Sequence, residues 1–224
     1  MIDHEVQADV RAAVDLAAST DIDGGALDGV GWTADTERAV DLHAGWRSVD
    51  ELPERLSDPL RVGRSDLLAA AGECRATGRW APLLASVNAW VHGASEDGAR
   101  RTRRILDQPD LGSRLAAAVA TLDGAGPVEA YYLLNNGGHL HGWGPVLFSR
   151  FLDAVDRRES GRALGLDASL ARAVNGLVPG SDLGTADWAT AEYAFYLGLV
   201  DRIAAEAGVG PTQVEAALAA KFGS

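Results

Sequence analysis

The amino-acid sequence predicts an all-α fold, a globular protein built from many helices. Apolar residues recur at helical spacing over most of the chain. No stretch alternates apolar and polar residues for long enough to predict a sheet. Hydrophobic residues make up 47% of the 224 residues, a share that supports a normal core rather than disorder. We therefore expect one compact helical unit, since no long polar linker divides the chain.

The N-terminal part is predicted to be an extension that packs on this core. Residues 3–19 have apolar side chains at helical spacing with acids on the opposite face. Gly, Asp and Pro then interrupt any long period, and we expect Trp32 and Trp46 to anchor this irregular stretch onto the core. The sequence is accordingly divided into an extension at 1–59 and a main domain at 60–224.

The main domain begins with a helix that Ser65 is expected to cap and that runs to about Arg75. Residues 81–92 carry the apolar stripe of a packed helix, and Pro82 suits its first turn. Further helices are predicted at 99–106, 110–122, 127–135, 145–156, 168–177, 185–207 and 211–222.

Several classes of protein are disfavoured by what the sequence lacks. No run of 18 apolar residues is free of charge, and the N-terminus is acidic where a signal peptide is basic, so we expect a cytoplasmic protein without a membrane span. The single cysteine, Cys74, is expected in the core, which leaves no internal disulfide and no cysteine-based zinc site. The histidines are too scattered for a metal site, and the nucleotide-binding and common hydrolase motifs are absent. We expect no metal and no organic cofactor.

The charge is strongly acidic overall but unevenly distributed. A net charge of −12 argues against a surface that binds nucleic acid everywhere. Lys221 is the only lysine, and four arginines cluster at Arg100, Arg101, Arg103 and Arg104. This cluster is either a phosphate-binding surface or an ordinary solvated helix face.

The segment at 127–174 is the most informative for function. It predicts a helix, a glycine-rich hairpin with Gly142 and Gly144, and a second helix that starts at Pro145. Glycines permit close approach of the backbone, and the amides at a helix N-terminus bind anions such as phosphate. The same pattern also suits a plain turn between two helices.

Asp167 stands at the predicted start of the following helix, between Leu166 and Ser169. It is either a simple N-cap, whose side chain accepts hydrogen bonds from backbone amides, or a carboxylate that faces a cleft. In a cleft it could activate water or stabilise a positively charged sugar. Spacing alone does not separate the two interpretations.

The run GWGPVLFSRFLDAV, followed by RALGLDASLARAV, resembles the 8-oxoguanine-glycosylase-fold proteins, a helix-hairpin-helix family related to archaeal guanine-oxidation glycosylases. The upstream segment RSDLLAAAGECRATGRWAPLLASVNAW and the later WATAEYAFYLGLVDRIAAEAG are similar to other helices of that family. The resemblance covers roughly 60–224. The motif falls on Gly142, Gly144, Pro145, Leu147, Phe148, Ser149, Arg150, Phe151, Leu152, Leu164, Leu166 and Asp167.

The resemblance implies a DNA glycosylase in which a flipped base enters a pocket while the hairpin grips double-stranded DNA. In that family a lysine attacks the sugar, but Arg150 occupies its position here, and a guanidinium does not readily form a Schiff base. We therefore expect a monofunctional enzyme that uses Asp167 and removes an oxidised guanine or a hypermodified phage base, the latter in antiviral defence. Two alternatives stay open: an inert DNA-binding module of the same fold and an acidic protein-interaction domain. A monomer is expected.

Further residues are assigned to binding of the substrate or the DNA, and for several of them a purely structural role is the alternative. His139 and His141 either contact phosphate or a base or are turn residues, and Asn136 either contacts a base or ends its helix. Trp143 either stacks in the pocket or wedges into DNA, or it packs against Phe148. The candidate catalytic residues are Asp167 and Arg150. The candidate substrate- or DNA-binding residues are Gly142, Trp143, Gly144, His139, His141, Asn136, Phe148, Ser149, Trp188, Arg100, Arg101, Arg103 and Arg104.

Overall fold

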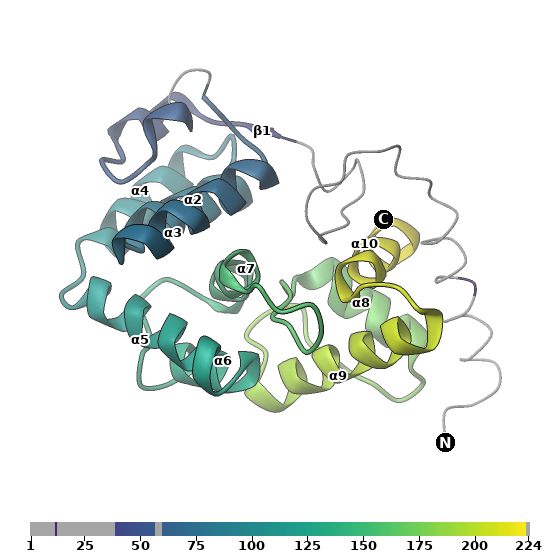
Figure 1. The fold of residues 1–224 in the computed structure, drawn as a ribbon. Coiled ribbons are helices and arrows are strands. Elements are labelled where there is room, and N and C mark those ends of the chain that lie inside the picture. The colour runs from purple at the N-terminus through teal and green to yellow at the C-terminus, as the bar shows by residue number, and fades with distance from the viewer. Residues whose placement is uncertain (1–11, 13–38, 57–59, 223–224) are drawn as a thin grey trace.

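The computed structural model describes residues 12, 39–56 and 60–222, and the regular secondary structure of this part of the chain is almost entirely helical (Figure 1). The predicted all-α fold is confirmed. The described helices are α2 (Arg64–Thr77), α3 (Ala81–His92), α4 (Glu96–Leu106), α5 (Leu111–Gly124), α6 (Pro127–Asn135), α7 (Pro145–Val155), α8 (Ala168–Leu177), α9 (Thr190–Ala207) and α10 (Pro211–Phe222).

The helix α7 lies at the centre, and the other helices are arranged around it (Figure 1). It packs against α2, α3, α5 and α6, while α8 packs against α10 and α10 against α9. Every residue of α7 is buried except Val146 and Arg150, which are half-buried. A helix that is buried on all sides positions its side chains firmly because its neighbours fix each rotamer. This burial matters for function because Arg150 is one of the two candidate catalytic residues.

The described part of the N-terminal segment packs on the helical core. Strands β1 (Val40–Asp41) and β2 (Arg61–Val62) form a two-residue antiparallel ladder that is too short for its alternation to be visible in the sequence. The short 3-10 helices η1 (Ala44–Ser48) and η2 (Glu54–Leu56) lie between them. Trp46 is fully buried, and its indole N–H donates a hydrogen bond to the Gly93 carbonyl. Trp46 is thus an anchor as predicted.

Two predictions for this segment lie outside the described residues. One is Trp32, and the other is the helix at 3–19 apart from Ala12, which is helical. The division of the chain at 59 and 60 stays a prediction.

Three predicted helix starts are wrong, each because a different side chain caps the helix. Ser65 lies inside α2, and the Asp66 carboxylate caps the helix by accepting the Gly63 N–H at 2.8 Å. The helix predicted at 99–106 begins earlier because Ser95 is the N-cap of α4. The helix predicted at 185–207 begins later, at Thr190.

The late start of α9 follows from the residues in front of it. Asp187 adopts a left-handed backbone conformation with φ of 57°, which no α-helix contains. The Glu192 carboxylate then accepts the Ala189 N–H and caps the helix.

The hydrophobic core is one continuous cluster that includes side chains from the N-terminal segment and from every described helix. Cys74 is buried in it as predicted, and burial raises the pKa of its thiol. None of the described helices combines the length and the apolar character that a membrane span requires.

Candidate functional site

Asp167 is the N-cap of α8, as its position in the sequence suggested. Its Oδ1 atom accepts the N–H groups of Ser169 at 2.9 Å and Leu170 at 3.0 Å. Its Oδ2 atom accepts a hydrogen bond from Arg150 at 2.8 Å. The side chain is 36% exposed, so the carboxylate lies at the surface of the core rather than inside it. A carboxylate has about four lone-pair sites, and three donors occupy three of them. One site therefore remains for a substrate or a water molecule.

The backbone that leads into Asp167 is fixed by side chains from two helices. The hydroxyls of Tyr193 and Tyr196 on α9 donate to the carbonyls of Leu164 and Gly165, at 2.9 and 3.2 Å. From α7, the Ser149 hydroxyl accepts the Leu166 N–H at 3.1 Å. Burial raises the pKa of both tyrosines well above the usual range, so their hydroxyls remain donors. These three bonds hold the loop and so fix where the Asp167 carboxylate lies.

Arg150 connects Asp167 to a second carboxylate that sequence reasoning missed. Its Nη1 atom donates to Glu215 Oε1 on α10 at 2.7 Å, while its Nη2 atom binds Asp167. The Arg150 side chain is 11% exposed and that of Glu215 is 7% exposed. The guanidinium therefore bridges α7, α8 and α10 at one point.

Gly165 and Trp90 form the walls of the channel in which the Arg150 side chain lies. A Cβ atom at position 165 would overlap the Cδ, Nε and Cζ atoms of Arg150, so only glycine fits there. On another side, the guanidinium carbon lies 5.6 Å from the ring centroid of Trp90, within the range of a cation–π contact. Packing and charge thus fix Arg150 together.

Burial and pairing act in opposite directions on these groups. Burial raises the pKa of Glu215 to about 7, and the Arg150 charge only partly opposes this rise. Burial lowers the pKa of Arg150, but the carboxylates of Glu215, Asp167 and Asp153 outweigh burial and bring its pKa above the usual value. Arg150 is therefore charged at neutral pH, whereas burial shifts the pKa of Glu215 from its usual acidic value toward neutrality.

A second group of buried charges lies next to this site. Asp153 on α7 pairs with Arg162 at 3.2 Å and with Arg64 at 3.5 Å. Burial lowers the pKa of Arg64 to about 9, which leaves it charged at neutral pH. The core around α7 therefore contains several buried arginines that are matched by buried carboxylates.

The glycine-rich hairpin joins α6 to α7 and is held by the neighbouring helices. The Gln108 side-chain amide donates to the His141 carbonyl and accepts the His141 N–H, both at 2.8 Å. Arg114 on α5 donates to the His139 carbonyl at 2.6 Å. Gly142 has φ of 79°, a conformation that favours glycine. The backbone of the hairpin is thus fixed, and the side chains of His139 and His141 are exposed.

Asn136 ends α6, which agrees with the structural one of the two interpretations of this residue. It is the C-cap residue, and its side-chain amide donates to the Tyr132 carbonyl at 2.8 Å. Its side chain is exposed on the hairpin, beside the two histidines in the sequence.

Four side chains expected at the base or the DNA are buried in the core instead, which corrects those assignments. Trp143 contacts Phe148 and Phe151 edge to face, and its indole N–H donates to the Asn88 side chain at 3.1 Å. The aromatic rings have large apolar surfaces, and burying these surfaces is more favourable in free energy than exposing them on a hairpin. The four residues are Trp143, Phe148, Ser149 and Trp188.

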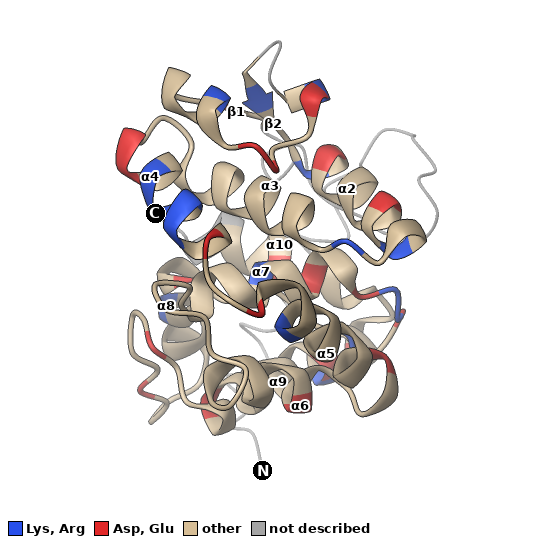
Figure 2. Cartoon of the chain, turned by 90° about the vertical axis from the view of Figure 1, so that its left-hand side faces the viewer, with Lys and Arg blue, Asp and Glu red and all other residues tan. Residues whose placement is uncertain are grey.

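The arginine cluster lies on α4 (Figure 2). Its four residues are exposed. Arg100 and Arg101 both pair with Asp97 one turn earlier. No acidic side chain in the described part of the chain forms an ion pair with Arg103 or Arg104. Helix α4 ends at Leu106, two residues before Gln108, whose side chain binds the hairpin at His141.

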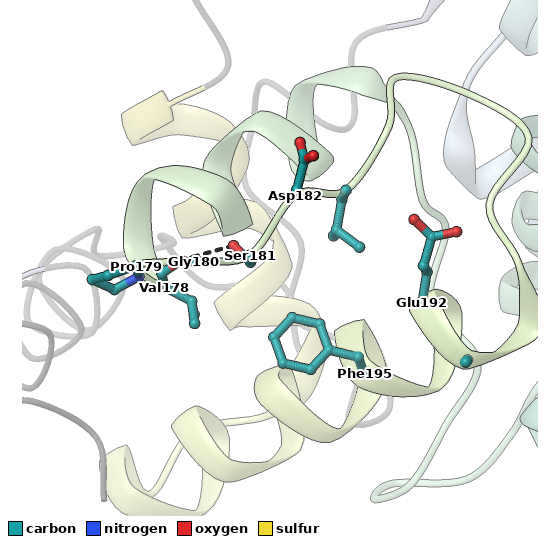
Figure 3. A pocket seen from close by; sticks show the side chains of 9 residues that line it. Val178, Pro179, Gly180, Ser181, Asp182, Glu192 and Phe195 are labelled. Carbon is teal, nitrogen blue, oxygen red and sulfur yellow. Dashed lines mark hydrogen bonds between the residues drawn. The ribbon is translucent and has the colours of Figure 1, made fainter.

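A hollow of about 400 Å³ lies at the opposite end of α8 from Asp167 (Figure 3). Phe195 points into it, and the carboxylates of Asp182 and Glu192 stand at its rim (Figure 3). A helix of ten residues is about 15 Å long, so this hollow is separate from the Asp167 site. Among the described residues, no group of three His, Cys, Asp or Glu side chains could hold a metal ion.

Three residues of the site escaped sequence reasoning, and each has a physical reason. Glu215 lies in α10, about fifty positions after Asp167, and only the packing of α10 on α8 brings it near Arg150. Trp90 belongs to the apolar stripe of α3, which is typical of any core helix. Gly165 stands between two leucines without a turn signal.

The comparisons with known proteins give one match. A family model described as "Putative 8-oxoguanine DNA glycosylase OGG-like protein" matches residues 11–219. The matched range begins nearer the N-terminus than the resemblance at 60–224 indicated. No curated protein and no solved structure matches the chain.

Proposed function

Because the family model matches most of the chain, the protein belongs to the 8-oxoguanine DNA glycosylase OGG-like family, and we propose that it excises a base from double-stranded DNA. The reaction is hydrolysis of the N-glycosidic bond. The oxygen of water bonds to the sugar carbon, the bond from that carbon to the base breaks, and the base leaves with a proton. The observation that carries this proposal is the Asp167 carboxylate, which is held by three donors and is still partly exposed.

Asp167 has the properties that this reaction requires of a carboxylate. Its negative charge stabilises the positive sugar that develops as the base departs, and its remaining lone pair orients the attacking water. The loop bonds from Tyr193, Tyr196 and Ser149 keep the carboxylate in place before the substrate arrives. Such preorganisation avoids a cost of rearrangement during the reaction.

Arg150 positions Asp167 in this proposal. Its two ion pairs and its burial support this role over contact with a DNA phosphate. A guanidinium remains protonated and does not form a Schiff base with the sugar. We therefore propose a monofunctional enzyme that leaves an intact abasic strand.

The substrate is proposed from the family description and from the presence of Arg150 where the resembling enzymes have a lysine. An oxidised guanine follows from the family description. A hypermodified phage base is the second candidate, because Arg150 departs from the lysine that the resembling repair enzymes use. The second candidate would imply a role in antiviral defence.

The hairpin and the end of α4 are the proposed DNA-binding surface. His139, His141 and Asn136 are exposed on a hairpin whose backbone is fixed, and α7 begins directly after this hairpin, at Pro145. The first amides of a helix bind anions such as phosphate. Arg103 and Arg104 lie one turn before Gln108, which binds the hairpin. The positive charge of these two arginines offsets the net negative charge of the protein at the place where we propose that the DNA phosphates bind.

This surface is tested by removing arginine pairs. Changing Arg103 and Arg104 together to alanine should lower the slope of log affinity against log salt by about 2, since each phosphate contact contributes about 0.9. The matched control removes Arg100 and Arg101, which Asp97 already partly neutralises, and should lower the slope less. Fluorescence anisotropy with a plain duplex measures both slopes. Equal slopes for the two double variants would refute the proposed surface.

A catalytically inert DNA-binding module is the second candidate function. It is favoured by one observation: both oxygens of Asp167 already have structural partners, one in the helix cap and one in Arg150. Base release separates the two functions.

The experiment is a base-release assay on a panel of duplexes, with mass spectrometry of the free base. The panel contains 8-oxoguanine, uracil, an alkylated base and glucosylated hydroxymethylcytosine. We expect release from at least one duplex by the natural protein and none by Asp167→Asn, which can keep the helix cap. Asp182→Asn, at the far end of α8, is the control and should remain active. No release from any duplex, with DNA binding intact, would favour the inert module.

A further inference from the structure

Glu215 is a buried carboxylate to which the proposed reaction assigns no role. It lies on α10 with 7% of its side chain exposed and binds Arg150 Nη1 at 2.7 Å. A buried charge is costly unless it is paired, so this carboxylate must depend on Arg150. Arg150 in turn holds Asp167 through its other nitrogen. The three groups therefore form a chain in which a change at Glu215 reaches Asp167 through one guanidinium.

The charges around Glu215 come from every element packed against it. Arg150 and Asp153 lie on α7, Arg64 on α2, and Asp167 at the start of α8. From α9, the hydroxyls of Tyr193 and Tyr196 face the same region and stay uncharged because burial raises the pKa of each. The ionised groups of this cluster are three arginines and three carboxylates: Arg64, Arg150, Arg162, Asp153, Asp167 and Glu215. Among these six groups, the positive and negative charges are equal in number when Glu215 is ionised.

We propose that Glu215 is a positioning residue that sets the charge at the Asp167 site. As a carboxylate it seats the Arg150 guanidinium and balances its charge, which leaves the Asp167 charge available to the substrate. When Glu215 takes up a proton, Arg150 neutralises Asp167 alone and the cluster gains one positive charge. A positive charge there opposes the positive sugar that develops as the base leaves. This inference rests on the proposed hydrolysis.

The expected signature is a rise of activity with pH through neutrality. Because burial raises the pKa of Glu215 to about 7, the carboxylate form replaces the acid in this range. One unit charge roughly 10 Å from the reacting atoms, at an effective dielectric of about 20, changes the rate about tenfold. We therefore expect the rate to be about tenfold higher at pH 8.5 than at pH 5.5.

The test compares the natural protein with Glu215→Gln in single-turnover base release from pH 5.5 to 8.5. The substrate is whichever panel duplex releases its base. Glutamine has the shape of glutamate and still accepts from Arg150, so the fold is retained, and circular dichroism checks this. The rise through neutrality should disappear in Glu215→Gln, with the rate at pH 8.5 lowered about tenfold. Glu206→Gln, an exposed acid on α9, is the matched control and should keep the rise. An unchanged pH profile in Glu215→Gln would overturn the proposal.

A measurement without substrate separates failure of this inference from failure of the proposed function. Nuclear magnetic resonance of the Arg150 side-chain N–H groups reports their hydrogen bonds in the 224-residue chain. In the natural protein these signals should titrate near pH 7, and in Glu215→Gln they should not. If no duplex releases a base, the proposed function fails, and this titration alone decides whether Glu215 controls Arg150. Arg150 signals that do not change between pH 5.5 and 8.5 would show that Glu215 does not act on Arg150 and would overturn the inference.

Discussion

Replacing Gly165 with alanine places a methyl group where the Arg150 side chain now lies. The new Cβ atom would overlap three atoms of that side chain, so the guanidinium must leave its channel. Forcing an extra methyl group into a packed core costs about 1–3 kcal/mol. Separating Arg150 from buried Glu215 adds a part of the roughly 3–5 kcal/mol that breaking a buried ion pair costs. The partly exposed contact with Asp167 adds little.

We therefore expect Gly165→Ala to lower the free energy of unfolding by about 3 kcal/mol. Urea denaturation followed by tryptophan fluorescence measures this change. Gly198→Ala is the control, because a Cβ atom at that helical position meets no atom within 4 Å. Its substitution should be neutral or stabilising by up to about 1 kcal/mol.

The reason for the loss is tested by repeating Gly165→Ala in a second background. That background carries Arg150→Ala, which removes the guanidinium, and Glu215→Gln, which removes the charge that would be left unpaired. There the same substitution should cost less than about 0.5 kcal/mol, because the methyl group no longer meets a side chain. An equal cost in both backgrounds would refute the steric argument.

Three further predictions concern the cap, the hairpin and the core. Asp167→Ala should be about 1 kcal/mol less stable than Asp167→Asn in urea denaturation, because alanine cannot cap α8; equal stabilities would contradict the cap. Gln108→Ala should weaken binding of a plain duplex about tenfold without changing the salt slope of that binding, since two hydrogen bonds of about 1 kcal/mol each to the hairpin are lost. An unchanged affinity in anisotropy would contradict the view that Gln108 holds the hairpin for DNA. Trp143→Phe should cost about 1–3 kcal/mol, because the Asn88 oxygen is left without its donor. DNA affinity should stay within about twofold, and a large loss would return Trp143 to the DNA surface.

The helical core was largely predictable because the signals for it are local. The stripe at 81–92, and Pro127 and Pro145 at the first positions of α6 and α7, gave helices at the expected residues. Capping was harder to predict, since Ser, Asp and Glu compete for nearby amides. Asp66 rather than Ser65 caps α2 because the helix begins at Arg64, which places Asp66 at the third helical position, from where its carboxylate accepts the Gly63 N–H.

The candidate site was predictable only where its residues lie close in the sequence. Arg150 and Asp167 were found through the motif that holds both. Glu215 depends on how α10 packs, and no local pattern marks it. For Trp143 the local pattern was present but gave a wrong prediction, because a tryptophan between hairpin glycines suggests exposure. In the structure the chain turns inward at Trp143, and its indole N–H donates to Asn88.

We propose that base excision proceeds by hydrolysis at Asp167 without a covalent bond to the protein. The most direct measurement is strand analysis of the duplex that releases its base, run with and without alkali and with borohydride present. We expect a strand that stays intact until alkali cleaves it, no protein–DNA product trapped by borohydride, and no abasic site with Asp167→Asn. A trapped protein–DNA adduct, or strand cleavage without alkali, would contradict it.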